Sequence, residues 1–133
     1  MRGRTQDDGS THRDKRHDYW GVVLDSPDSR ALARFYAELL GWDLGSEGRA
    51  IIPPDGVAYI SFQDSPEYVR PVWPPAPGVQ QQMLHLDFEV DDLETAVAHA
   101  EELGATQAAF QPQKEVRVML DPDGHPFCLY ANG

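Results

Sequence analysis

The stretch LHLDFEVDDLETAVAHAEELG, residues 84–104, decides the fold of this 133-residue chain. It contains a strand of alternating apolar and polar residues, two aspartates, an amphipathic helix pattern and a glycine stop. A similar layout occurs in the first half, where a strand-like run leads into a helix pattern that stops at Gly41. Superimposing Asp28 on Asp92 also places Gly21 on His85. The sequence therefore predicts two copies of one structural module.

In the first copy, Ser26 suits the N-cap and Pro27 the first turn of a helix that continues to Leu40. The apolar residues of this segment recur with helical spacing, and the glycine that follows suits a C-terminal cap. Extended segments are expected at 49–52 and 57–62, because a Pro-Pro-Asp-Gly turn separates them.

In the second copy, Asp91 and Glu94 form a pair typical of a capping box at the start of the helix. Strands are expected afterwards at 108–110, 115–120 and 126–130. Each copy thus has a strand, a helix and then two or three strands.

Changes in composition define the organisation of the chain. The first residues are polar and lack apolar periodicity, which favours a disordered leader. Proline is concentrated between the two copies, where it excludes a regular helix or a central strand. The predicted parts are the leader at 1–17 and a single domain at 18–133, with module one at about 19–64, the linker at about 65–79 and module two at about 80–131.

Bulk properties exclude several classes of protein. A hydrophobic content of 41% favours a folded globule. No run of about 20 apolar residues is present to span a bilayer, and the N-terminus lacks a secretory signal pattern, so the expected location is cytoplasmic. After residue 18 the chain has six basic against eighteen acidic residues, a balance that repels nucleic acid and anionic membranes. A single cysteine excludes an intramolecular disulfide and a multi-cysteine zinc site.

Three stretches carry a family resemblance: FYAELLGW at 35–42, HLDFEVDDLETAVAHAEELGA at 85–105 and VMLDPDGHPFCL at 118–129. Their order and spacing resemble the vicinal oxygen chelate superfamily, and within it the glyoxalase-like domains related to bleomycin resistance proteins and dioxygenases. The resemblance covers about 19–131. It implies an α+β fold of two βαβββ modules, whose paired curved mixed sheets surround a central cavity with the helices outside. Many relatives bind a divalent metal there, whereas others are metal-free binding or resistance proteins.

Strand alternation predicts which side chains face the ligand, because neighbouring residues point to opposite faces of a sheet. The alternating apolar residues from Leu84 to Val90 are expected to pack beneath the helix, as are Phe127 and Leu129. The side chains that then point into the concavity are those of His85, Asp87, Glu89, Cys128 and Tyr130.

The resemblance implies that a metal centre would take ligands from the first and last strands of both modules. The first-strand positions carry Gly21 and His85, and the last strand of module two offers Cys128. The last strand of module one offers three alternatives, which are Ile60, Ser61 and Gln63.

Of the two first-strand positions, only His85 carries a side chain typical of a metal ligand, since Gly21 has no side chain. A catalytic zinc or iron site normally needs about three protein ligands, and Asp87 would be the third only in a shifted site. We therefore expect no cofactor and no metal. If a metal were bound, its ligands would be His85, Cys128 and Gln63.

The sequence leads to two functional hypotheses. The first is metal-independent binding of a small molecule, with resistance or sequestration as one version. The alternative is a lyase, isomerase or dioxygenase-type enzyme, in which His85 is a base oriented by Asp87 or Cys128, or a ligand of a rearranged metal site. A homodimer is expected in either case. The ligand contacts that we predict are Phe62, Gln63, Tyr68, Trp73, His85, Cys128 and Tyr130.

Overall fold

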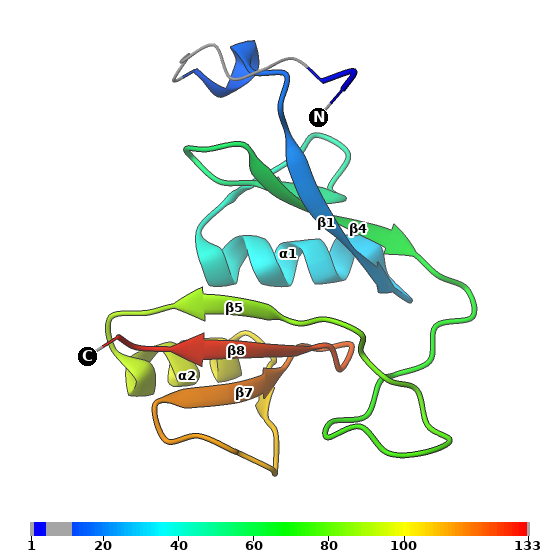
Figure 1. Cartoon of the computed structure of the whole chain (residues 1–133), viewed down its shortest axis with the longest axis vertical. Coiled ribbons are helices and arrows are strands. Elements are labelled where there is room, and N and C mark those ends of the chain that lie inside the picture. The colour runs from blue at the N-terminus through cyan, green and yellow to red at the C-terminus, as the bar shows by residue number, and fades with distance from the viewer. Residues whose placement is uncertain (1, 5–11, 133) are drawn as a thin grey trace. The chain divides into compact units, whose positions relative to one another are not determined.

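The computed structural model describes residues 2–4 and 12–132 of the chain. These residues form two compact units, with the boundary between Pro66 and Glu67. Each unit contains a four-stranded mixed sheet and one α-helix (Figure 1). The predicted α+β fold with two βαβββ modules is confirmed. The central cavity that the resemblance implies stays a prediction.

Module one has the strand order β1-β4-β3-β2. Strands β1 and β4 are parallel, and the other neighbouring pairs are antiparallel. The elements in chain order are β1 (Trp20–Ser26), α1 (Ser29–Leu40), β2 (Asp43–Leu44), β3 (Ala50–Ile52) and β4 (Ala58–Asp64).

Module two repeats this topology with the strand order β5-β8-β7-β6. Strands β5 and β8 are parallel, as Figure 1 shows, and the other pairs are antiparallel. The elements are β5 (Leu86–Glu89), α2 (Leu93–Glu102), β6 (Thr106–Gln107), β7 (Val116–Leu120) and β8 (Pro126–Tyr130).

The two modules share their register as well as their strand order. In module one Val23 pairs with Ser61, and in module two Asp87 pairs with Cys128. The alignment of Gly21 with His85 also places Val23 on Asp87. Ser61 is therefore the counterpart of Cys128, which decides between the three positions that the sequence left open.

Each helix covers one face of its own sheet with apolar side chains. In module one, Leu32 and Tyr36 of α1 are buried, and the Tyr36 ring stacks on Phe62 with the ring centroids 5.8 Å apart. In module two, Val97 of α2 is buried, as is Phe127 of β8, the strand that α2 contacts. These packed faces leave the opposite face of each sheet for other side chains.

Both predicted N-caps are wrong by one or two residues. The caps are Asp28, whose carboxylate accepts a hydrogen bond from the Ala31 N–H at 3.1 Å, and Asp92. Ser26 is instead the last residue of β1, and its hydroxyl oxygen accepts from the Asp28 N–H in the turn before the helix. Asp91, the residue predicted as the cap of α2, lies one position before the observed cap Asp92, whose carboxylate accepts from the Thr95 N–H. The repeat alignment had paired the two true caps with each other.

Two strand predictions also need correction. Leu84 lies before β5 and is 56% exposed, so it does not pack beneath the helix. No strand is found at 108–110, and the edge strand ends at Gln107. The Ala108 N–H still donates to the Val118 carbonyl at 3.0 Å. Beyond it the Gln111 side chain bonds the same backbone: its amide oxygen accepts from the Val118 N–H at 2.8 Å, and its amide nitrogen donates to the Val118 carbonyl at 2.8 Å.

The proline-rich linker is fastened to module two. The Tyr68 hydroxyl donates to the Asp123 carbonyl at 2.6 Å, and Arg70 donates to the carbonyl of Pro122 at 3.0 Å. Both acceptors lie in the turn between β7 and β8. The linker therefore belongs structurally to the second unit, which begins at Glu67.

The predicted leader falls partly on residues 1 and 5–11, which lie outside the described residues. In its described part, a short 3₁₀-helix covers Arg13–Lys15, and Arg16 forms an ion pair with Asp18. No helix in the described ranges has the length and apolarity needed to cross a membrane.

Candidate functional site

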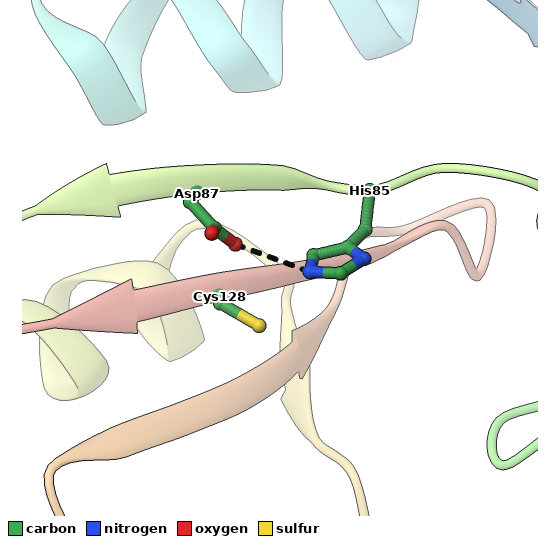
Figure 2. Close-up of side chains that lie close together, drawn as sticks. All are labelled: His85, Asp87 and Cys128. Carbon is green, nitrogen blue, oxygen red and sulfur yellow. Dashed lines mark ion pairs between the residues drawn. The ribbon is translucent and has the colours of Figure 1, made fainter.

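Three side chains capable of chemistry converge on one face of the module-two sheet (Figure 2). His85 precedes β5, Asp87 lies within it, and Cys128 lies on the adjacent strand β8. The Nε2 atom of His85 is 3.2 Å from a carboxylate oxygen of Asp87. One potential ligand atom from each of the three residues lies within 4.8 Å of the other two.

Local structure explains this convergence. His85 and Asp87 are two residues apart in extended chain, so their side chains share a face. The parallel register places Asp87 directly beside Cys128. Phe127 and Leu129 are almost fully buried on the helix side, which fixes Cys128 on the opposite face. The sequence prediction of a shared face for the three residues matches this arrangement.

A pocket of about 370 Å³ opens at this cluster. Its volume is near the lower end of the range for small-molecule sites. Two carboxylates, Asp87 and Glu115, line it, whereas none of its lining residues in the described part of the chain is Lys or Arg. The lining consists of His85, Asp87, Gln113, Glu115, Val116, Cys128, Tyr130, Ala131 and Asn132.

The thiol of Cys128 is strongly affected by its surroundings. Burial raises the pKa of Cys128 to about 11, and the negative charge of Asp87 and a hydrogen bond with that carboxylate act in the same direction. The thiol is therefore protonated at neutral pH. Because the thiolate is the reactive form, this environment does not favour Cys128 as a nucleophile.

Of the other predicted contacts, Tyr130 lines this pocket, whereas Phe62 and Gln63 belong to module one. Phe62 is 3% exposed and stacks on Tyr36, so most of its ring packs within the core. It also borders a separate hollow of about 400 Å³ in module one. The Gln63 side-chain amide donates to the Asp25 carboxylate at 3.0 Å.

The linker residues Tyr68 and Trp73 do not line the pocket of module two. The Tyr68 hydroxyl binds the β7–β8 turn and lies 3.5 Å from Nε2 of His125. The other ring nitrogen of His125, Nδ1, is 2.8 Å from the carboxylate of the buried Asp121. The Trp73 indole N–H donates to the Phe110 carbonyl at 3.4 Å. Both aromatic residues thus hold the linker to module two.

One wall of the pocket was missed by sequence reasoning. This wall comprises Gln113, Glu115 and Val116, together with Asn132, whose amide donates to the Glu89 carboxylate at 2.9 Å. Val116 pairs with Tyr130 in the antiparallel register of β7 and β8. The Pro-Asp-Gly turn predicts a hairpin, and this hairpin would have indicated that Val116 lies beside Tyr130. The loop before β7 has no sequence pattern that indicates its position at the pocket.

Module one has no equivalent group at the position of His85. The ring of Tyr59 lies against Gly21, its partner in the parallel register. A Cβ atom at residue 21 would lie 2.4 Å from the ring, which is too close without movement. The sequence identified the glycine as a missing ligand but not the tyrosine that covers it.

The donor atoms allow a test of whether a metal ion suits this site. An imidazole nitrogen, a carboxylate oxygen and a thiol sulfur make up the cluster. Mg²⁺ and Ca²⁺ prefer sets of oxygen ligands, so they do not fit. Zinc and related ions accept all three types of donor. The structure therefore supplies Asp87 as a third donor, which the sequence allowed only in a shifted site, and Gln63 is not in the cluster.

A family model described as Glyoxalase-like domain matches residues 21–130. The chain is 31% identical over 124 residues to the uncharacterized protein YaeR of Escherichia coli (strain K12), and the match covers 82% of this chain and 92% of that protein.

Solved structures share this fold. One is a glyoxalase/bleomycin resistance protein/dioxygenase family enzyme from Burkholderia phytofirmans PsJN, with a TM-score of 0.59, 20% identity, and coverage of 84% of this chain and 95% of that one. Another is TnmS3, an antibiotic binding protein from Streptomyces sp. CB03234, with a TM-score of 0.55, 21% identity, and coverage of 90% and 98%.

Proposed function

Because the chain belongs to the glyoxalase-like domain family, we propose that it binds a small organic molecule in the module-two pocket without requiring a metal for that binding. The observation that carries this proposal is the pocket of about 370 Å³ in which His85, Asp87, Cys128 and Tyr130 meet. A solved structure that shares this fold is an antibiotic binding protein, which supports sequestration or resistance as one version.

The lining indicates the chemistry of the ligand. Asp87 and Glu115 supply acceptors and negative charge, while the imidazole of His85 and the phenol of Tyr130 supply further hydrogen-bonding groups. The charged lining is acidic, so a ligand rich in hydrogen-bond donors, or one with a positive charge, suits it best. The aromatic ring of Tyr130 adds a surface on which such a ligand can pack.

Metal independence is supported by the register of module one. The counterparts of His85 and Cys128 there are Gly21 and Ser61, and the ring of Tyr59 covers the glycine. A metal centre that draws ligands from both modules therefore lacks one first-strand ligand. Gln63 stays a predicted ligand contact, with its amide bonded to Asp25 in the free protein.

A binding screen on chelator-treated protein tests the proposal. Thermal shift and native mass spectrometry should find compounds that bind with one molecule per chain. Tyr130→Ala should weaken this binding at least about tenfold, because it removes one wall of the pocket. His99→Ala, which removes an exposed imidazole from α2, is the matched control and should leave binding unchanged. Compounds that bind equally well to Tyr130→Ala would place the site elsewhere.

The resistance version has its own test. A compound that binds the purified chain should become less toxic to a susceptible bacterium that expresses the chain. Expression of Tyr130→Ala at the same level should not give this protection. If the natural chain and Tyr130→Ala protect equally well, protection does not depend on ligand binding in this pocket.

A second candidate function is supported by the contact between His85 and Asp87. A carboxylate 3.2 Å from the imidazole can orient it and stabilise its protonated form, as a general base requires. A lyase or isomerase that removes a proton beside a carbonyl group would use this arrangement. Turnover of an identified substrate should then fall by at least about a hundredfold in His85→Ala. Unchanged turnover would remove His85 from the mechanism.

A further inference from the structure

The cluster of His85, Asp87 and Cys128 offers more than contacts to an organic ligand. We propose that these three residues bind one soft or borderline divalent cation, of the zinc type, within module two alone. The inference does not rest on the proposed function, because the pocket can bind an organic molecule with or without an ion. It also differs from a centre that is shared between two modules, because all three donors belong to one sheet.

Backbone geometry positions the three donors before any ion arrives. Asp87 and Cys128 are partners in the parallel register of β5 and β8, and His85 is two residues from Asp87 on the same face. The donors lie within 4.8 Å of one another. Figure 2 shows the imidazole and the carboxylate extending toward each other, with the thiol beside them.

One donor–donor distance is already close to that of a tetrahedral site, and all three donors lie within 4.8 Å of one another. With metal–ligand bonds of about 2.0–2.3 Å, the ligand atoms of a tetrahedron lie about 3.3–3.8 Å apart. The separation of 3.2 Å between His85 and Asp87 is already near this range. The side chains of His85 and Asp87 are 46% and 57% exposed, so they have room for the small rotations that would complete the site.

The chemistry of the donors selects the class of cation. A sulfur ligand favours zinc, cobalt or copper over magnesium and calcium, and the imidazole adds to this preference. Three protein ligands would leave a fourth position, and the pocket of about 370 Å³ provides space for it. A water molecule or a donor atom of a small molecule can occupy that position.

The experiment uses the full chain after removal of metals with a chelator. Titration with Co²⁺ should give one equivalent per chain, with the near-ultraviolet band of a cobalt–thiolate bond and intense visible bands of a four-coordinate ion. Zn²⁺ should abolish these bands by displacement. Competition with a chromophoric chelator then gives the zinc affinity, which we expect to be submicromolar.

Three variants test the ligands one at a time. Cys128→Ser should eliminate the cobalt–thiolate band, whereas His85→Gln and Asp87→Asn should weaken zinc binding by at least about tenfold. The matched controls are His99→Gln and Asp91→Asn, which remove the same types of side chain at exposed positions outside the cluster. Circular dichroism of each variant shows whether it retains the fold.

Histidines near the N-terminus are the main alternative source of metal binding. A His12→Gln/His17→Gln double variant should therefore bind cobalt as the natural chain does. The proposal is overturned if no cobalt–thiolate band appears, if Cys128→Ser binds zinc as tightly as the natural chain, or if the double variant loses the ion. Ligand binding by the chelator-treated chain is measured separately, so failure of the metal site and failure of the proposed function give different results.

Discussion

At the scale of single residues, Cys128 combines a central position in the pocket with low reactivity. Its pKa of about 11 means that little thiolate is present at pH 8. We expect iodoacetamide to modify it at least about tenfold more slowly than an exposed model thiol, even after the greater nucleophilicity of a high-pKa thiolate is considered. Asp87→Asn should accelerate the reaction, because it removes a negative charge that disfavours the thiolate.

Mass spectrometry of metal-free protein at fixed times gives these rates. Glu115→Gln is the control, since it removes a different carboxylate from the same pocket. A rate that does not rise in Asp87→Asn would show that burial alone controls the thiol.

The contact between Gly21 and Tyr59 gives a second prediction for individual residues. Gly21→Ala should lower the free energy of unfolding by about 1–3 kcal/mol, because the new methyl group would overlap the tyrosine ring. Tyr59→Ala should relieve this overlap, so the double variant should be more stable than the sum of the two single effects. Urea denaturation of the four proteins measures the coupling. If the effects of the two substitutions on the free energy of unfolding simply add, the new methyl group does not clash with the Tyr59 ring.

At the scale of elements, the N-cap of α2 links helix stability to pH. Hydrogen bonds from the side chain and backbone of Thr95 lower the pKa of Asp92, whose carboxylate accepts from the Thr95 N–H at 2.7 Å. A lowered folded-state pKa contributes stability above the unfolded pKa of about 3.9, and this contribution is lost as the pH falls through the folded value. Asp92→Asn should keep a cap but lose this dependence.

Urea midpoints between pH 6 and pH 2.5 test this prediction. The advantage of the natural chain over Asp92→Asn should be greatest at pH 6 and should shrink as the pH falls below about 4. Glu94→Gln removes a carboxylate from the same turn without removing the cap, so it should retain the steep acid limb. Parallel profiles for the natural chain and Asp92→Asn would contradict the assignment.

The same elements show how far the sequence could be interpreted. Superimposing the repeats paired Asp28 with Asp92, and both are true caps, although the local cap motifs favoured Ser26 and Asp91. Strand alternation also placed Asp87 and Cys128 each on the strand face opposite the helix, because alternation depends on residues close in the chain. That their two strands lie side by side came from the family resemblance.

Features that depend on distant contacts could not be predicted in this way. The side chain of Gln111 reaches the backbone of Val118 just beyond the end of the edge strand, and no local pattern indicates this contact. The ring of Tyr59 lies against Gly21 only because β1 and β4 pair in one register. Gln113 and Glu115 line the pocket through the position of the loop before β7, which no periodic pattern specifies.

At the scale of the whole molecule, we expect the chain to form a homodimer in solution. Large apolar side chains are exposed in both units, among them Trp20 at 57% and Met83 at 84%. Burial of such surface is a common reason for self-association. Light scattering after size exclusion should give twice the chain mass of 14.9 kDa. A mass of one chain over a wide range of concentrations would show that the protein is a monomer.

The identical register of the two modules has a consequence for protein engineering. Module one contains the same backbone positions as the site in module two, but with Gly21, Val23 and Ser61 in place of the histidine, aspartate and cysteine. Substituting histidine, aspartate and cysteine at these positions of module one, together with Tyr59→Ala to make room, would create the same cluster on the second copy of the fold. The chain therefore contains one module with the site and one without it, and the second can be used to test which residues the site requires.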